Sequence, residues 1–379
     1  MSLHSVKLPT GLLTVKEESG VIPLGDICQF GARNNAKRGF LFVSGELGKH
    51  LPSSPSVMRL SHEYLAREIE TSPEGPVVFV GMAETAVGLG YGVFSAWMSG
   101  GSRPAAYLHT TRYIAEGGEA FPFEEGHSHA PNQFIQQPSP DVAELMRDAK
   151  TMVLVDDEAS TGRTFANLWR VVHPWCPNVE LVNITTLTNF MDRSARVQLA
   201  QALGVKTHYV QAVSGVWSFE ADDSFVHQSP VSNLKSKDNP PKVPAGLGRL
   251  GITQRLEIPI SVWKEITPVL EEAECKTVRI VAIGEFMHAA IVLGDTLEDM
   301  GYKVLLQSST RSPILVFGPI KTTLHLKDPY GRGDPYFIYN AEPDDSVITF
   351  VLHETECNSA ITDLAEQIKG VPIHWTDAL

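Results

Sequence analysis

Residues 152–164 constrain the fold of this chain more than any other stretch. The first four are Met, Val, Leu and Val, and this apolar run predicts a short buried strand of a parallel sheet. Apolar residues at helical spacing resume at Phe165, so residues 156–164 are predicted to form a strand-to-helix turn. Open α/β sheets bind their ligands at the carboxyl ends of strands, where such a turn lies. The sequence therefore predicts an α/β fold with a ligand site at this turn.

The residues of the turn indicate what the ligand is. Small side chains allow backbone N–H groups to surround a phosphate, and the following helix points its positive end at the same anion. Asp156 and Asp157 cannot serve that phosphate, because like charges repel. Ionised carboxylates only accept hydrogen bonds, so a pair of them suits the two hydroxyls of a ribose. The pattern thus predicts a ribose 5-phosphate site, with a turn carrying solvated acids as the alternative.

This run resembles the loop that binds phosphoribosyl diphosphate (PRPP) in the type I phosphoribosyltransferases. The family pattern is an apolar strand, two acids, two variable residues, then Ser or Thr, Thr, Gly, Lys or Arg, and Thr. The resemblance implies a mostly parallel sheet flanked by helices. It also implies a reaction in which a nucleobase-like nitrogen displaces pyrophosphate from C1 of PRPP.

The resemblance assigns roles to individual residues of the loop. Asp156 and Asp157 are expected to bind the ribose hydroxyls. The residues expected at the 5-phosphate are Ser160, Thr161, Gly162, Arg163 and Thr164. Mg²⁺ is the implied cofactor, bound to pyrophosphate oxygens, with Asp156 and Asp157 as its candidate protein ligands through water.

A second turn is expected to contact the pyrophosphate. Residues 77–80 predict another buried strand. In the type I family the turn after this strand contacts pyrophosphate, often through a non-proline cis peptide, which here assigns Ala83, Glu84 and Thr85. Arg112 follows the next predicted strand, and its planar fork can bridge two phosphate oxygens. We expect Arg112 to neutralise the leaving group, whereas an ordinary turn at 83–85 is the alternative.

Residues 117–137 are rich in Gly, Pro and charge, and they are too many for a plain connector. Long loops at this place in the type I family close over the reacting sugar, and excluding water protects a cation-like transition state. His127 and His129, beside Glu124 and Glu125, are therefore candidate lid residues at the pyrophosphate. Surface histidines are an equally good interpretation, and a metal site of these histidines and acids is a third.

Basic residues flank a strand-like apolar run at residues 40–43. They are Arg33, Lys37 and Arg38 before it and Lys49 and His50 after it. These side chains could reach a substrate phosphate, but composition alone favours solvated side chains. A helix is predicted next, capped near Ser56 and burying Leu60, Tyr64, Leu65 and Ile69.

The second half of the chain resembles a degenerate copy of the first. Three residues that each follow a predicted strand mark the copy: Glu285, Arg311 and Glu354. They repeat, at nearly the same spacing, Glu84, Arg112 and Asp157, which predicts an internal duplication. The copy lacks the paired aspartates and the Thr-Gly-Arg-Thr run, so it is not expected to bind PRPP in the same way. A separate activity, with Glu285, Arg311 and Glu354 lining a cleft of its own, is left open.

Thr310, Arg311, Ser312 and Pro313 resemble the signature of the TRSP domain. That domain occurs carboxyl-terminal to a phosphoribosyltransferase-like domain in proteins of tellurite-resistance gene clusters. The resemblance predicts a phosphoribosyltransferase-like domain at residues 1–235 and a TRSP domain, itself degenerate phosphoribosyltransferase-like, at residues 236–379. It links the product to a nucleoside-like metabolite of a tellurite-resistance or stress pathway, but it supplies no substrate.

Two positions depart from the type I pattern. Ser160 stands where enzymes of the hypoxanthine type have an aspartate base, and a hydroxyl is too weakly basic for that role, which argues against hypoxanthine or guanine. Glu158 stands where the family usually has an aliphatic residue, so it is expected to face the substrate. Glu158 is the candidate general base, with a lid residue as the alternative.

Composition limits the partners. The formal net charge of −13 argues against nonspecific binding to nucleic acid or an anionic membrane, so a polyanionic substrate needs a local basic cluster. The four cysteines lie far apart without a CxxC pair, which indicates neither a disulfide framework nor a zinc site. The amino terminus lacks an apolar secretory core and no run could span a bilayer, so a cytoplasmic protein is expected.

A regulator that senses PRPP or a nucleotide is the rival function class, since fold does not fix function. Such a protein needs an output surface, and no basic helix-turn-helix is visible. The sequence does not predict the acceptor, the task of the second half or the oligomeric state, for which a homodimer is one option.

Overall fold

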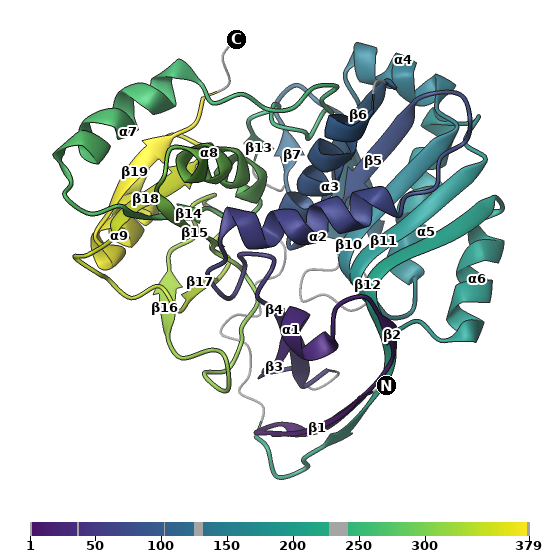
Figure 1. Cartoon of the computed structure of the whole chain (residues 1–379), viewed down its shortest axis with the longest axis horizontal. Coiled ribbons are helices and arrows are strands. Elements are labelled where there is room, and N and C mark those ends of the chain that lie inside the picture. The colour runs from purple at the N-terminus through teal and green to yellow at the C-terminus, as the bar shows by residue number, and fades with distance from the viewer. Residues whose placement is uncertain (1, 36–37, 102, 125–131, 227–241, 377–379) are drawn as a thin grey trace.

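The computed structural model describes residues 2–35, 38–101, 103–124, 132–226 and 242–376. Within these ranges the chain forms two main sheets, each covered by helices (Figure 1). The predicted α/β class is therefore confirmed, and so is the mostly parallel sheet of the first half.

The larger sheet has the strand order β1-β2-β12-β11-β10-β5-β6. In that order the strands are β1 (Leu3–Leu8), β2 (Gly11–Gly20), β12 (Lys206–Ala221), β11 (Leu181–Asn189), β10 (Thr151–Ala159), β5 (Val77–Gly81) and β6 (Ala105–His109). The strands from β12 to β6 run parallel, whereas β2 pairs antiparallel with β12 and β1 pairs antiparallel with β2. All of β5 and the first five residues of β10 are buried, because both faces of a parallel sheet are covered and apolar residues fill them.

Helices cover both faces of this sheet. They are α2 (Pro55–Arg67), α3 (Ala86–Gly100), α4 (Pro140–Asp148), α5 (Arg163–Val172) and α6 (Arg193–Leu203). Phe79 and Val153 point into the core beneath α2 and α3. Val78 and Leu154 point into the opposite core, beneath α4, α5 and α6. Alternate residues of neighbouring strands thus enter two separate cores, as the strand period of two requires.

The smaller sheet is entirely parallel, with the order β15-β14-β18-β19. Its strands are β15 (Lys303–Ser308), β14 (Thr277–Ala282), β18 (Ile348–His353) and β19 (Gly370–His374), and its helices are α7 (Ile260–Glu272), α8 (Met287–Asp299) and α9 (Ser359–Ile368). The shorter elements are α1 (Leu24–Ile27), β3 (Cys28–Ala32), β4 (Phe40–Ser44), β7 (Ile114–Ala115), β8 (Ala120–Glu124), β9 (Asn132–Gln136), a 3₁₀ turn (His173–Trp175), β13 (Lys242–Val243), β16 (Thr323–Leu326) and β17 (Tyr336–Tyr339).

The first half of the chain, which carries the larger sheet, and the second half, which carries the smaller sheet, share one topology. The order β15-β14-β18-β19 repeats β6-β5-β10-β11. Each half also carries an antiparallel hairpin, β8–β9 in the first half and β16–β17 in the second. In each half one isolated bridge joins this hairpin to the loop after the edge strand. The bridge is Thr111–Phe134 in the first half and Thr310–Phe337 in the second. This repeated arrangement supports the predicted duplication and makes Thr310 the counterpart of Thr111.

Helices from both halves lie between the two sheets. Figure 1 shows α2, α3 and α8 in this central position. The contact is close at Gly88 of α3, where an added Cβ would lie 2.8 Å from Met287 Cγ of α8. Backbone bridges Ser53–Leu306 and Arg33–Ile314 also join the halves.

The helix predicted after residue 55 forms, but its details differ from the prediction. Ser54, and not Ser56, accepts the capping hydrogen bond, from Val57 N at 3.3 Å. Leu60 is 67 % exposed, so its predicted burial is wrong. Leu65 is buried as predicted, and the buried face of α2 also includes Met58, which packs into the core of the second half beneath α8.

In the described part of the chain, no helix combines the length and apolar character that crossing a membrane would require.

The packing of α3 on α2 predicts a position-dependent cost for alanine. A Cβ at Gly92 would lie 2.1 Å from Nδ1 of the buried His62 ring, so Gly92→Ala should lower the free energy of unfolding by about 1–3 kcal/mol through overpacking. Gly100, in the same helix, has no atom within 4 Å of an added Cβ, and Gly100→Ala should be neutral or stabilising. Urea unfolding of both variants measures the difference; equal stabilities would contradict this packing.

Candidate active site

A cavity of about 190 Å³ lies at the carboxyl ends of β5 and β10. It brings together most of the predicted site residues: Ala83, Glu84, Thr85, Arg112, Asp156, Asp157, Glu158, Ser160 and Thr164. Thr161, Gly162 and Arg163 do not line it, and Thr161 and Arg163 are exposed. A wider groove of about 990 Å³ lies between α2, α3 and α8, but no predicted site residue lines that groove.

The strand before the acids is longer than predicted. β10 continues to Ala159, with Asp156 paired to Thr186 and Glu158 paired to Thr188 of β11. The turn is therefore confined to residues 160–162, and α5 begins at Arg163. Gly162 adopts φ 74°, and a Cβ there would lie 2.7 Å from Met191 Cε, so both backbone conformation and space favour glycine.

The acids stay at the edge of the cavity. Asp156, Asp157 and Glu158 are partly exposed, and Asp156 Oδ1 accepts a hydrogen bond from Asp157 N at 2.9 Å. Two neighbouring carboxylates on a strand end present several acceptor oxygens to one ligand, which is the arrangement that a diol requires.

The Ala83–Glu84 peptide is cis, as the family resemblance implies. Two side chains hold this turn. Thr110 Oγ1 accepts a hydrogen bond from Ala83 N at 2.8 Å, and Gln133 Nε2 donates to Ala83 O at 2.8 Å. Thr110 Oγ1 in turn donates to Gln133 Oε1 at 2.6 Å. Sequence reasoning missed Gln133, because β9 brings it to a turn that lies 50 residues earlier in the chain.

The Glu84 side chain, 9 % exposed, lies between two cations at the cavity wall. Its Oε1 lies 2.7 Å from Lys49 Nζ, and its Oε2 lies 3.4 Å from Nε of Arg311, which belongs to the second half. Burial alone would raise the pKa of the Glu84 carboxyl, but Lys49 and Arg311 outweigh burial and lower the pKa to about 2. The Glu84 carboxyl is therefore ionised at pH values near neutral.

The basic residues around β4 are not solvated, so that expectation is wrong for Arg33, Arg38, Lys49 and His50. Lys49 and His50 are buried, and Arg33, Arg38 and His50 line the cavity. Burial, together with Lys49 and Arg33, lowers the pKa of His50 to about 3. Lys37 lies outside the described residues.

Arg38 and Glu158 form an ion pair at the cavity wall. Arg38 Nη2 lies 2.8 Å from Glu158 Oε1 and 2.7 Å from Oε2. The guanidinium also stacks on aromatic rings, with its Cζ 4.6 Å from the centroid of Phe40 and 5.8 Å from that of Trp217. Both Glu158 oxygens already accept from Arg38, which weakens the argument for Glu158 as a general base.

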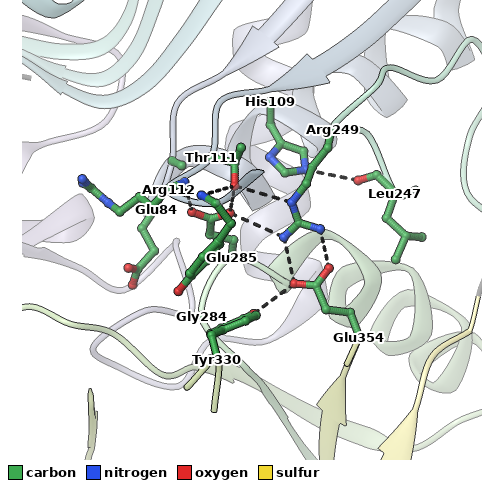
Figure 2. Close-up of polar contacts among 12 residues, drawn as sticks. Glu84, His109, Thr111, Arg112, Leu247, Arg249, Gly284, Glu285, Tyr330 and Glu354 are labelled. Carbon is green, nitrogen blue, oxygen red and sulfur yellow. Dashed lines mark hydrogen bonds and ion pairs between the residues drawn. The ribbon is translucent and has the colours of Figure 1, made fainter. Parts of the chain in front are cut away.

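Arg112 is positioned by a carboxylate of the second half. Glu285 accepts from Arg112 N at 2.8 Å and from Thr111 Oγ1 at 2.6 Å (Figure 2). Glu285 also lies 3.5 Å from Arg249. Burial raises the pKa of the Glu285 carboxyl, and Arg249 opposes that shift.

Glu354 is the other carboxylate that the buried Arg249 contacts. Arg249 Nη2 donates to Glu354 Oε1 at 2.8 Å, and Tyr330 donates to the same oxygen at 2.9 Å. Glu285 and Glu354 therefore meet through Arg249, whereas Arg311 points to the first-half cavity. The interpretation in which Glu285, Arg311 and Glu354 line one separate cleft does not fit this geometry.

The described residues include only the flank of the candidate lid. His127, His129 and Glu125 lie outside the described residues. The hairpin that flanks them packs on the helix after the acidic turn, where Asn167 Nδ2 of α5 donates to Glu124 O at 2.9 Å. Across the described ranges, no three His, Cys, Asp or Glu side chains gather as a metal site would require.

Two family models match separate parts of the chain. A family model described as phosphoribosyl transferase matches residues 27–216, and a model of the TRSP domain carboxyl-terminal to it matches residues 247–368. No curated protein matches the chain.

Several solved structures are similar to about half of this chain. Adenine phosphoribosyltransferase of Trypanosoma brucei, in complex with AMP, pyrophosphate and ribose-5-phosphate, is 13 % identical, with 56 % of this chain and 87 % of that chain covered and a TM-score of 0.34. The Giardia lamblia adenine enzyme with 9-deazaadenine is 13 % identical, covering 51 % and 98 %, with a TM-score of 0.33. Orotate phosphoribosyltransferase of Francisella tularensis is 13 % identical, covering 50 % and 82 %, with a TM-score of 0.28.

These structural overlaps are too weak to decide anything about this chain, whereas the two family models together span most of it. The chain belongs to the phosphoribosyl transferase family and is a phosphoribosyltransferase with a TRSP domain on its carboxyl side.

Proposed function

We propose that the protein transfers the phosphoribosyl group of PRPP to a ring nitrogen of a nucleobase-like acceptor. The C1–O bond to pyrophosphate breaks, pyrophosphate leaves with the electron pair, a C1–N bond forms and the acceptor nitrogen loses a proton. Such a transition state resembles an oxocarbenium ion, so positioning and charge stabilisation supply most of the catalysis.

One observation carries the proposal. The two carboxylates that end β10, the turn at the cis peptide and Arg112 all line one small cavity. A PRPP molecule has three parts that need recognition, which are a diol, a 5-phosphate and a pyrophosphate. In this proposal Asp156 and Asp157 bind the diol, residues 160–164 bind the 5-phosphate, and the backbone of residues 83–85, together with Arg112 and not the Glu84 carboxylate, binds the pyrophosphate.

Mg²⁺ fits the oxygen-rich wall of the cavity. Asp156 and Asp157 are hard oxygen donors, which Mg²⁺ prefers, and the described residues offer no ready-made three-ligand cage. The pyrophosphate oxygens would therefore be the main ligands, with the two aspartates contacting the ion through water. When bound, the ion would neutralise charge on the leaving group.

The acceptor is proposed to lie beside Arg38 and Leu41, on the wall formed by β4. Ser160 in place of an acidic base continues to argue against hypoxanthine and guanine. The TRSP domain is the basis for proposing a nucleoside-like product in a tellurite-resistance or stress pathway. The cytoplasmic location remains a prediction.

Replacing Asp156 and Asp157 together by Asn should weaken PRPP binding at least tenfold, because amides lack the negative charge that strengthens hydrogen bonds from the ribose hydroxyls. Calorimetric titration with PRPP and Mg²⁺ measures binding, and mass spectrometry after incubation with a panel of bases identifies any product. Asp148→Asn, exposed at the end of α4, is the matched control. A wild-type protein that neither binds PRPP nor releases pyrophosphate would contradict the proposal, and tight binding without turnover for every base would favour the sensor.

The Arg38–Glu158 pair predicts non-additive effects. If Glu158 acts by holding Arg38 at the acceptor, Glu158→Gln and Arg38→Gln should each lower turnover more than tenfold, and the double variant should lose no more than either single one. PRPP affinity should stay unchanged in all three. Turnover is measured with the acceptor found in the panel. Unchanged turnover in Glu158→Gln rules out any catalytic part for this residue, and fully additive losses rule out the pair acting as a unit.

A further inference from the structure

The second half of the chain forms part of the wall of the first-half cavity. Thr310, Arg311 and Ser312, from the loop after β15, line it beside Glu84 and Arg112. The isolated bridges Thr111–Phe134 and Thr310–Phe337 occupy the same place in the two halves, so Arg311 is the topological counterpart of Arg112. Two equivalent arginines, one from each half, therefore reach one cavity.

The contacts of Arg311 place it at the turn assigned to pyrophosphate. Its Nε lies 3.4 Å from Glu84 Oε2 and its Nη1 lies 3.2 Å from Asp334 Oδ2. The side chain is 11 % exposed, so it is largely withdrawn from bulk water while still bordering the cavity. Ion pairs of this length are replaceable by a more highly charged anion that offers several oxygens to the planar guanidinium.

The equivalent place in the second half is filled by protein. Register aligns Leu352 with Ala282 as it aligns Val155 with Gly81, so Glu354 stands where Asp157 stands in the first half. The guanidinium of Arg249 lies between Glu354 and Glu285 and is fully buried (Figure 2). Arg311 instead lines the first-half cavity.

A buried lysine fixes the loop of Arg311 against the first half. Lys49 Nζ donates to Ser309 O at 2.8 Å and to Gly284 O at 3.1 Å, while it pairs with Glu84 at 2.7 Å. One ammonium thus joins the turn assigned to pyrophosphate to two loops of the second half, the loop after β14 and the loop after β15. This arrangement sets Arg311 beside the turn before any ligand binds.

We propose that Arg311 binds the pyrophosphate group of PRPP, so that the TRSP domain acts as a built-in second subunit that completes the active site of the first half. This inference rests on the proposed function. It assigns the second half a task in binding the leaving group, and it explains why that half keeps Arg311 while its own site is closed by Arg249.

The test compares PRPP with ribose 5-phosphate, which lacks the pyrophosphate group. Arg311→Gln should weaken binding of PRPP with Mg²⁺ at least tenfold in calorimetric titration and leave binding of ribose 5-phosphate unchanged. Arg311→Lys, which keeps the charge without the fork, should weaken PRPP several-fold at an unchanged unfolding temperature. The lysine variant keeps the test decisive if Arg311→Gln does not fold.

Arg59→Gln is the matched control. Arg59 of the first half also pairs with acids of the second half. Its Nη2 lies 2.8 Å from Asp295 and 3.2 Å from Glu298 of α8, but Arg59 does not line the cavity. Its PRPP affinity should equal that of the wild type.

Three results would overturn the inference. Arg311 variants that bind PRPP as tightly as the wild type would overturn this inference and leave the proposed function standing. Equal losses for PRPP and ribose 5-phosphate would do the same, because they indicate general damage to the site. A wild-type protein that does not bind PRPP would overturn the proposed function and this inference with it.

Discussion

The buried ammonium of Lys49 is the contact on which the geometry of the cavity depends. A charge that leaves water destabilises the fold by several kcal/mol unless partners surround it, and Lys49, at 3 % exposure, finds Glu84 in the first half and two carbonyls in the second. Glu84 needs the same contact, because Lys49 and Arg311 keep its pKa near 2 against the effect of burial. The Glu84 carboxylate is therefore kept ionised by Lys49 of the first half and by Arg311 of the second half, so fold and site are coupled through one ion cluster.

The two halves show how one topology serves two purposes. After β5 the acid Glu84 faces an open cavity, whereas after β14 the equivalent Glu285 is buried and accepts hydrogen bonds from Thr111 and Arg112 of the other half. Each half thus reaches the acidic turn of its partner with the loop after its edge strand. The difference lies in Arg249, which occupies one centre with a side chain. A guanidinium fixed between two carboxylates is a permanent occupant, while the first-half cavity keeps its acids at the rim.

Local sequence was enough to predict the strands, the acidic turn and the repeated spacing, because these features depend on short-range patterns. The same evidence predicted solvated side chains for Arg38, Lys49 and His50, and the structure buries them or sets them at the cavity. Their burial comes from partners more than a hundred residues away, such as Glu158 for Arg38 and Ser309 for Lys49. The prediction for Leu60 is wrong in the opposite sense: it was predicted buried and is exposed, because α2 packs a different face against α8. Pairing across the fold, and not residue type, decides such positions.

The second half supplies positive charge that a polyanionic ligand in the first-half cavity needs. A chain with a formal charge of −13 repels a polyanion at long range, and the acids Glu84, Asp156, Asp157 and Glu158 add to that repulsion at the cavity itself. Arg38 pairs with Glu158 at 2.7 Å, whereas Arg311 contacts its acids at the longer distances of 3.4 and 3.2 Å. A pyrophosphate bound there needs further fixed cations, and Arg311 adds one from the second half. Losing the second half would remove that cation and expose Lys49 and Glu84 to water, so affinity for a phosphorylated ligand and the shape of the turn would change together.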